Sequence, residues 1–162
     1  DTGLLDVRAA RQDELAPRVV SIPWGSEVEP SVAGARRYAA LGQRDDAALA
    51  ALAETVAWHA ALGPATVAAR ANAIADRLRD ELQALGVPFV SPLKPEFTSN
   101  VVILAAPREA LATLPQRVFE ASGVVTAAVG GLRMSPHVYN TAEHVGRVSR
   151  AIAGVRGELG RA

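Results

Sequence analysis

The sequence is poor in several residue types, and each shortage excludes a class of function. It has no cysteine, which excludes disulfides, a thiolate nucleophile and thiolate metal sites. Its 17 basic residues balance its 17 acidic residues, so no net charge draws it to nucleic acid or to an anionic membrane. No apolar run approaches the roughly 20 residues that span a bilayer, and no signal peptide opens the chain. We therefore expect a cytoplasmic protein whose partners are neither nucleic acid nor membrane.

Reactive and metal-binding motifs are also scarce. The three histidines are too scattered for the spacing of metal ligands, and no Ser-His-Asp order or phosphate-binding loop is present. The only lysine, Lys94, lies in a proline-flanked loop and is interpreted as an exposed surface residue. We interpret His59 as a core or edge residue of a helix and His144 as a surface residue. No catalytic residue is predicted within the chain.

The most informative segment is 132–141, which reads Leu-Arg-Met-Ser-Pro-His-Val-Tyr-Asn-Thr. Alternation along a strand places Arg133 and Met134 on opposite faces, and Pro136 ends the strand. Asn140 suits a turn, and Thr141 suits the N-cap of a helix. The Arg133 guanidinium therefore lies at a strand end beside a polar turn, where it could hold a small carboxylate through two parallel hydrogen bonds.

Two consecutive helices are predicted in the middle of the chain. The first opens at the acids 45–46, which suit a helix N-terminus, and Gly63 ends it. Pro64 begins the second helix at its first position, and Gly86 caps its end. The first carries one apolar face, made by Leu49, Leu52, Val56 and His59. The second carries a stripe typical of an amphipathic helix on a sheet rather than of a coiled coil, made by Val67, Ala71, Ile74, Leu78, Leu82 and Leu85.

The period changes beyond residue 87. Val101–Ala106 is an apolar run typical of a buried strand, and two more strands are predicted at 124–129 and 131–135. Helices are predicted at 115–122 and 141–155, the latter with Val145, Val148, Ile152 and Val155 inward. This order predicts an α+β layer, a small antiparallel-type sheet with helices on one face. Earlier in the chain, 4–7 is a short strand candidate and 15–24 is extended.

Several segments resemble the class V aminotransferases, a family of fold-type-I enzymes that use pyridoxal phosphate (PLP). Segment 132–141 resembles their C-terminal signature, and Thr2–Arg8 resembles the strand that follows their cofactor lysine. Arg18–Gly25 is similar to a loop of isopenicillin N epimerase-like members. Gly42–Asp45 resembles a Gly-Thr-Arg-Asp segment that reaches across a dimer to the neighbour's PLP phosphate. Together these segments cover nearly the whole chain in order.

The resemblance implies roles for individual residues. Gly42 and Gln43 would contact the PLP phosphate, with Gln43 in the place of the family's threonine. Arg133 would anchor the α-carboxylate of an amino-acid substrate, against the alternative of a structural arginine. His137 would contact substrate or present its ring to solvent from the turn, and Trp24 would line the active-site mouth or pack a domain edge. Arg36 and Arg37 are interpreted as a solvated face, with an anion contact across a dimer as the alternative.

The resemblance also implies a division of the chain and a partner. Residues 1–63 would be the end of the large PLP-binding α/β domain, and 64–162 the long linking helix and the small C-terminal domain. The cofactor lysine would precede Asp1, so the chain would be the C-terminal part of a longer enzyme and would act as a homodimer or with an N-terminal segment. The reaction would be epimerase, C–S lyase or desulfurase, or aminotransferase chemistry. The alternative is a non-catalytic α+β module that binds a small anion or mediates dimerisation.

Overall fold

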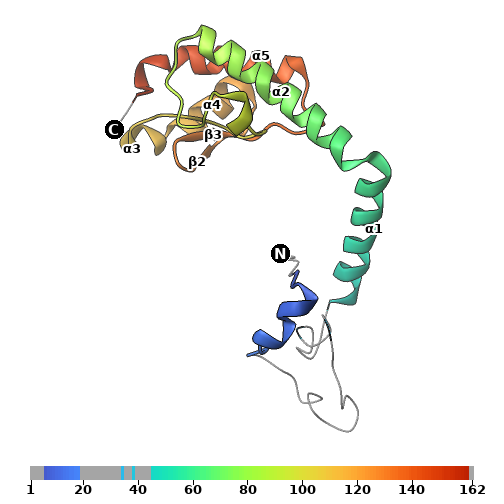
Figure 1. Cartoon of the computed structure of the whole chain (residues 1–162). Helices are drawn as coiled ribbons and strands as arrows, with labels where there is room; N and C mark the ends of the chain where they lie inside the picture. The colour runs from blue at the N-terminus through green and yellow to red at the C-terminus, as the bar shows by residue number, and fades with distance from the viewer. Residues whose placement is uncertain (1–5, 19–33, 35–37, 39–44, 161–162) are drawn as a thin grey trace. The chain divides into compact units, whose positions relative to one another are not determined.

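A computed structural model describes residues 6–18, 34, 38 and 45–160. Its elements in chain order are η1 (Ala9–Glu14), α1 (Asp46–Leu62), α2 (Pro64–Ala84), η3 (Pro95–Phe97), β1 (Val102–Leu104), α3 (Arg108–Leu111), α4 (Leu114–Ser122), β2 (Ala127–Ala128), β3 (Leu132–Met134), α5 (Ala142–Gly154) and η4 (Arg156–Glu158) (Figure 1). Two compact units divide the chain, Asp1–His59 and Ala60–Ala162. This boundary lies close to the predicted division after residue 63, whose assignment to the two domains of an enzyme stays a prediction.

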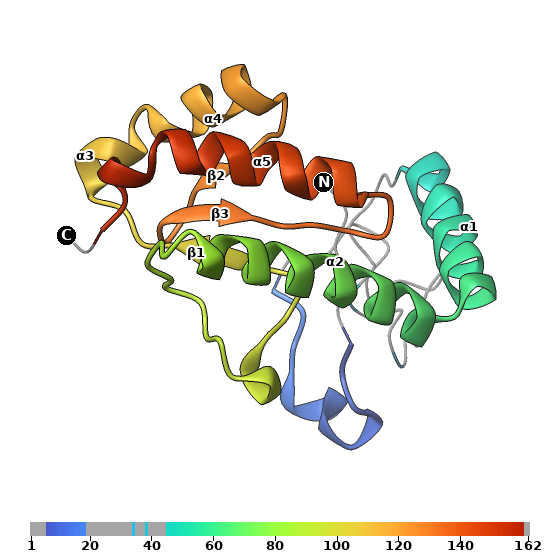
Figure 2. The ribbon, with the colours of Figure 1, turned by 90° about the horizontal axis from the view of Figure 1, so that it is seen from above.

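The second unit is an α+β layer, as the sequence predicts. Its sheet has the order β1-β3-β2, and both pairs of strands are antiparallel. Helices α2 and α5 lie side by side over one face of the sheet (Figure 2), and α4 packs against α5 and β2. The strands are shorter than predicted, because only Val102–Leu104 and Ala127–Ala128 form ladders within the expected segments 101–106 and 124–129.

Segment 88–91 extends the sheet beyond β1. Phe89 forms an isolated antiparallel bridge with Leu104, and the amide of Val90 donates to the carbonyl oxygen of Ile103 at 2.9 Å. The hydroxyl of Ser91 accepts a hydrogen bond from the Ile103 amide at 3.1 Å. The outer edge of β1 is therefore partly paired, although this segment is too irregular to count as a strand.

The core of the second unit joins the apolar stripe of α2 to the inward residues of the sheet and α5. Each fully buried aliphatic side chain stabilises the fold by about 1.5–3 kcal/mol relative to exposure. The cluster confirms all four predicted inward positions of α5, but of the predicted stripe of α2 it contains only Ile74, Leu78 and Leu82. Val67 is half-buried and lies outside the cluster. The cluster consists of Ile74, Ala75, Leu78, Leu82, Val87, Val102, Leu104, Leu114, Val118, Leu132, Met134, Val145, Val148, Ala151, Ile152 and Val155.

Local signals set the ends of the helices. Gly63 precedes α2 with φ 80° and Pro64 begins that helix, while Gly123 ends α4 in the left-handed region with φ 68°. Glycine reaches such angles without a steric penalty. Thr141 is the N-cap of α5, where its side chain accepts from the His144 amide. All of these boundaries agree with the predictions from sequence.

The N-terminal part differs from the sequence expectation. The described part of the predicted strand 4–7 forms no strand, and η1 follows it at Ala9–Glu14. Helix α1 forms where predicted, but none of its 17 residues is buried. Along the predicted apolar face, Val56 stays 54% exposed. His59 is half-buried, and its ring meets that of Trp58 edge-on with centroids 5.0 Å apart.

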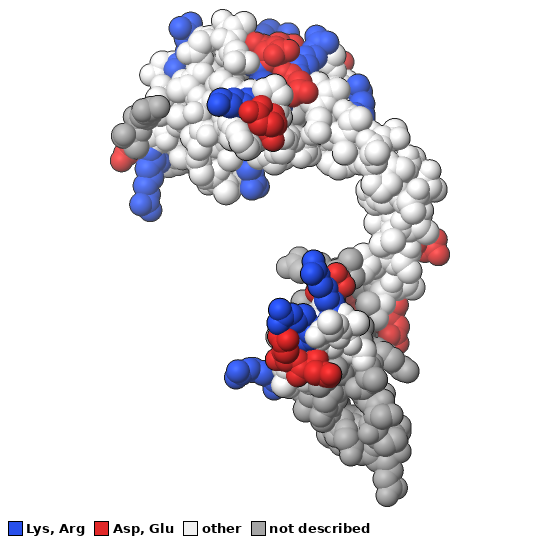
Figure 3. Space-filling model, in the orientation of Figure 1, with Lys and Arg blue, Asp and Glu red and all other residues white. Residues whose placement is uncertain are grey.

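The described residues on the face drawn in Figure 3 carry no dominant charge. On the face drawn in Figure 3, acidic and basic side chains are interspersed over the described residues of the second unit, without an extended basic stripe. The hydrogen bond from Arg117 in α4 to Glu158 in η4, at 2.5 Å, raises the pKa of the guanidinium above its usual value. No helix in the described part of the chain is both long and apolar enough to cross a membrane.

Candidate carboxylate-binding site

Arg133 occupies the middle of the central strand. Its register partners are Ile103 on β1 and Ala127 on β2. Its neighbours Leu132 and Met134 are buried in the core, and side chains alternate along a strand. Arg133 therefore points to the sheet face opposite α2 and α5. This confirms the prediction that Arg133 and Met134 lie on opposite faces, but Arg133 is at the middle of β3 and not at a strand end as predicted.

The Arg133 guanidinium is half-buried and available. It has no hydrogen bond or ion pair with any residue that the structure describes. A guanidinium presents a planar set of N–H donors that matches the two oxygens of a carboxylate. Partial burial beside Ile103 strengthens such a pair, because water screens it less than at the open surface. The position can therefore hold a carboxylate.

The turn before β3 fixes the register of Arg133. Gly130 and Gly131 have φ values of 68° and 135°, which non-glycine residues rarely adopt. The amide of Val129 donates to the Gly131 carbonyl oxygen at 2.9 Å. A Cβ atom on Gly131 would also collide with the carbonyl oxygen of Leu104. Glycine at 131 thus permits the close approach of the turn to β1.

The turn after β3 is held by two asparagines. The side-chain oxygen of Asn140 accepts from the His137 amide at 2.8 Å, and the Asn140 amide donates to the His137 carbonyl oxygen at 3.0 Å. The side chain of Asn100 donates to the Pro136 carbonyl oxygen at 3.1 Å. These bonds tie the turn to the segment that leads into β1. The predicted turn role of Asn140 is confirmed, whereas the role of Asn100 gave no signal in the sequence.

His137 lies within this turn, and its ring does not simply face solvent. The residue is half-buried and stacks on Tyr139 with ring centroids 5.2 Å apart. Its Nδ1 atom is buried and has no hydrogen-bond partner among the described residues. A buried polar atom without a partner costs about 1–3 kcal/mol. The Nδ1 atom of His137 is therefore an unsatisfied buried polar atom of this turn.

Arg79 is a structural residue that sequence reasoning missed. It is buried in α2, where Nη1 donates to Asp76 Oδ1 at 2.6 Å and Nη2 donates to the carbonyl oxygen of Ser99. It thereby anchors the loop that presents Asn100. The sequence did contain a signal for the burial of Arg79, because residue 79 lies four positions after Ala75 and three before Leu82 and therefore falls on the buried stripe of α2.

His144 has a capping role at the start of α5 that the interpretation as a surface residue did not include. The sequence suggested a surface residue in place of the glutamate of a capping box. The residue is half-buried at the surface, and its Nδ1 accepts from the Thr141 amide at 3.2 Å. A neutral imidazole nitrogen is an acceptor as glutamate is, so histidine completes the capping box of α5.

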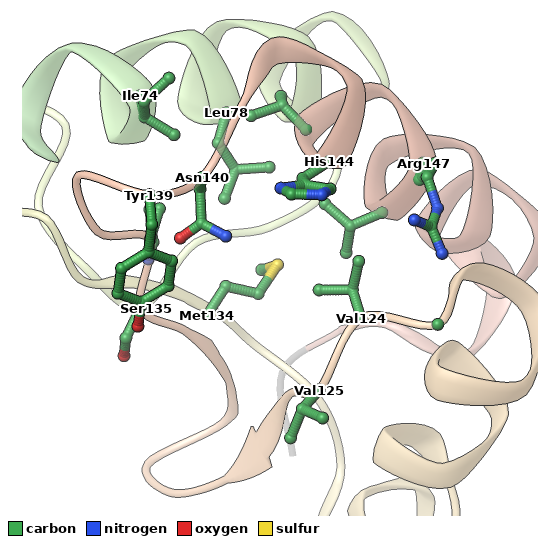
Figure 4. A pocket seen from close by; sticks show the side chains of 14 residues that line it. Ile74, Leu78, Val124, Val125, Met134, Ser135, Tyr139, Asn140, His144 and Arg147 are labelled. Atoms are coloured by element: carbon green, nitrogen blue, oxygen red, sulfur yellow. The ribbon is translucent and has the colours of Figure 1, made fainter. Parts of the chain in front are cut away.

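A cavity of about 350 Å³ lies on the other side of β3. Met134 and Ser135 line it, but Arg133 does not. Figure 4 shows Met134 among the side chains of this cavity. Alternation along β3 explains the separation, since the side chains of residues 133 and 134 leave opposite faces of the sheet. The concave site and the predicted carboxylate site are therefore two different places.

Apart from His137, the other residues predicted to bind cofactor, substrate or an anion fall in segments that the structure does not describe. Trp24, Gly42 and Gln43 lie outside the described residues, as do Arg36 and Arg37. Lys94 is exposed just before η3, as predicted for a surface lysine. No group of three or more metal-binding side chains occurs in the described ranges. The described residues thus fit a carboxylate but not PLP, because they offer neither a buried lysine nor a phosphate cradle.

Comparison with known proteins gives one distant relative. The chain is 28% identical, over 175 aligned positions, to a protein named isopenicillin N epimerase from Streptomyces clavuligerus. The alignment covers 96% of this chain but 44% of that protein, so the chain spans less than half of the relative's length. No family model and no solved structure matches the chain. The similarity agrees with the epimerase-like resemblance of segment 18–25, and it supports at most a distant relation to that class of protein.

Proposed function

We propose that this chain is the substrate-carboxylate part of a PLP-dependent enzyme that acts on an amino acid. The observation that carries the proposal is the Arg133 guanidinium, which is half-buried and unpaired within the described residues. The Leu-Arg-Met-Ser context of Arg133 and the similarity to isopenicillin N epimerase support it. Epimerase, C–S lyase or desulfurase, and aminotransferase chemistry are all compatible, since each holds the substrate α-carboxylate.

The role of this chain is to position the substrate. Arg133 would bind the α-carboxylate through two parallel N–H donors, and the ring of His137, in the turn after β3, would contact the substrate. PLP supplies the electron sink for the chemistry at the substrate's α-carbon. We assign its lysine to sequence preceding Asp1 or to a partner chain. In a homodimer, Gly42 and Gln43 would reach the partner's PLP phosphate, and Trp24 would line the mouth of the site.

Arg133→Lys in the assembled enzyme tests the proposal. We expect kcat/KM for the amino-acid substrate to fall by an amount that corresponds to a loss of about 2–5 kcal/mol in transition-state stabilisation, because lysine keeps the charge but lacks the planar fork. Arg108→Lys is the matched control, since Arg108 is exposed on α3. A fall in kcat/KM of less than about threefold (about 0.6 kcal/mol) in a folded Arg133→Lys enzyme would show that the substrate carboxylate is bound elsewhere.

Chemical trapping tests where the cofactor lysine lies. The 162-residue chain mixed with PLP and reduced with borohydride should form no stoichiometric pyridoxyl adduct, since Lys94 is exposed on a loop. Mass spectrometry of tryptic peptides measures the outcome. A specific adduct on Lys94 would contradict the proposal. A lysine codon shortly before the codon for Asp1 would support it.

A non-catalytic module is the second candidate. The observation in its favour is that Ala60–Ala162 is a compact unit with its own core and carries Arg133. Such a unit could bind a small carboxylate without any cofactor. The two candidates differ in one measurement: if a protein extended upstream of Asp1 binds no PLP while Arg133 still binds carboxylates, the module is the correct description.

A further inference from the structure

The cavity beside Met134 has the size and the walls of a small-ligand site. It lies entirely within the second unit, between α2, α5, the loop after α4 and the turn after β3. Its volume, about 350 Å³, falls in the range of ligand pockets, which combine apolar walls with a few polar groups. The role proposed above for Arg133 makes no use of it.

The inner wall of the cavity is apolar. Ile74 and Leu78 come from α2, Val145 and Val148 from α5, and Met134 from β3, and all five are buried. Val124 and Val125 close the side formed by the loop after α4, and Val125 is 79% exposed. An alkyl chain placed here would contact this apolar wall, would cover part of the exposed side chain of Val125 and would meet no aspartate or glutamate.

One end of the cavity is cationic. Arg147 and His144 line it from α5, one helical turn apart, and no aspartate or glutamate lines it. Within the described ranges, Arg147 has no hydrogen bond or ion pair. Figure 4 shows its guanidinium directed toward the loop that carries Val124. Such a free guanidinium next to an apolar wall suits an amphipathic anion.

Two further features shape this cationic end. A Cβ atom on Gly123 would lie 2.5 Å from Arg147 Nη2, so the glycine leaves the space that the guanidinium fills. His144 Nδ1 already accepts from the Thr141 amide, so the neutral ring carries its proton on Nε2 and can donate there. Ser135 and Tyr139 lie at the other end of the cavity in Figure 4, away from Arg147.

We propose that this cavity is a second ligand site, which binds a small monocarboxylate with an unbranched apolar tail. The carboxylate pairs with Arg147, and the tail lies along Val124, Met134 and Val148. The site is independent of Arg133, because residues 133 and 134 point to opposite faces of β3. It does not rest on the function proposed for Arg133.

Hexanoate is the test ligand, with hexan-1-ol and hexylamine as matched ligands that lack the negative charge. Amide chemical shifts of the isotope-labelled 162-residue chain report binding residue by residue. We expect hexanoate to shift Val124, Met134 and Arg147 with a millimolar dissociation constant. Hexan-1-ol should bind at least about tenfold more weakly (about 1.4 kcal/mol), and hexylamine more weakly still.

Two substitutions on α5 sharpen the test. Arg147→Gln should weaken hexanoate binding at least about tenfold, because the charge-assisted pair is lost. Arg150→Gln should change it less than about twofold, since Arg150 is exposed on the same helix and does not line the cavity. Equal effects of both substitutions, or equal binding of hexanoate and hexan-1-ol, would overturn the proposal. If Arg147→Gln does not fold, the ligand comparison on the unsubstituted chain decides alone.

Discussion

Two consecutive helices, α1 and α2, show how differently neighbouring segments use apolar residues. Only Gly63 separates Asp46–Leu62 from Pro64–Ala84. Helix α1 is rich in alanine and leucine, yet none of its residues is buried. Helix α2 carries more charged residues, and six of its residues are buried. Burial therefore does not follow from apolar content.

The arrangement of the apolar residues explains part of the difference. In α2 they recur along one stripe while Asp76, Arg77 and Asp80 are exposed, so a single face packs on the sheet and α5. In α1 alanines surround the helix, and Trp58 remains 57% exposed. Alanine favours the helix through its propensity, but its small side chain contributes little buried area. Helix α1 thus depends on local propensity, whereas α2 depends on tertiary packing.

The sharpest test of this comparison is a pair of leucine truncations. Leu82→Ala in α2 should lower the free energy of unfolding by about 2–5 kcal/mol, because it leaves a cavity in a closely packed core. Leu82 is fully buried, whereas Leu52 in α1 is half-buried. Leu52→Ala should cost less than about 1 kcal/mol. Urea unfolding followed by circular dichroism measures both.

The slope of the free energy of unfolding against urea concentration serves as the control, since an unchanged slope shows that both variants unfold from equally compact states. Equal costs for the two truncations would mean that α1 is packed as tightly as α2, and the comparison would fail.

A smaller effect should come from Gly131, whose requirement is set by a tertiary contact. Gly131→Ala combines an unfavourable φ of 135° with a clash against the Leu104 carbonyl oxygen. We expect it to cost about 1–3 kcal/mol and to disturb the β1–β3 ladder that presents Arg133. Gly157→Ala is the control, because a Cβ atom there meets nothing within 4 Å. If both glycine variants are equally stable, the turn before β3 does not fix the strand.

The smallest effect should come from a local contact, the capping box of α5. Thr141→Ala should cost about 1 kcal/mol, because it leaves the His144 amide without its acceptor. His144→Gln keeps an acceptor for the Thr141 amide and should cost less than about 0.5 kcal/mol. Thr113→Ala is the control, since Thr113 precedes α4 without a side-chain cap. Thermal unfolding measures all three, and an equal loss for Thr113 and Thr141 would exclude the capping role.

Much of the fold could be predicted because its signals are local. Gly63 followed by Pro64, Gly123 after α4 and Thr141 before α5 mark helix ends through backbone angles and side-chain bonds. The strands were predicted too long. An apolar run such as 101–106 indicates that a segment is buried in the core, but the partner strands decide how many of its residues form a ladder.

The candidate site was predictable in part. Strand alternation alone is enough to place Arg133 on the face away from the core, and Asn140 fitted the turn that it occupies. The burial of Arg79 could have been predicted from its place on the stripe of α2, but the partner of Arg79, the role of Asn100 and the cavity beside Arg147 could not. Each depends on segments that are far apart in the sequence, such as α2 and the loop at Ser99.

By itself the sequence determined the positions of α1, α2, α4 and α5, the α+β class and the placement of Arg133 and Met134 on opposite faces of β3, because periodicity, caps and glycine angles act within a few residues. The tertiary structure decided which helix is buried, how short the strands are and where a cavity remains. These features depend on how side chains from distant segments fill the space between α2, α5 and the sheet, and close packing is a property of the assembled layers.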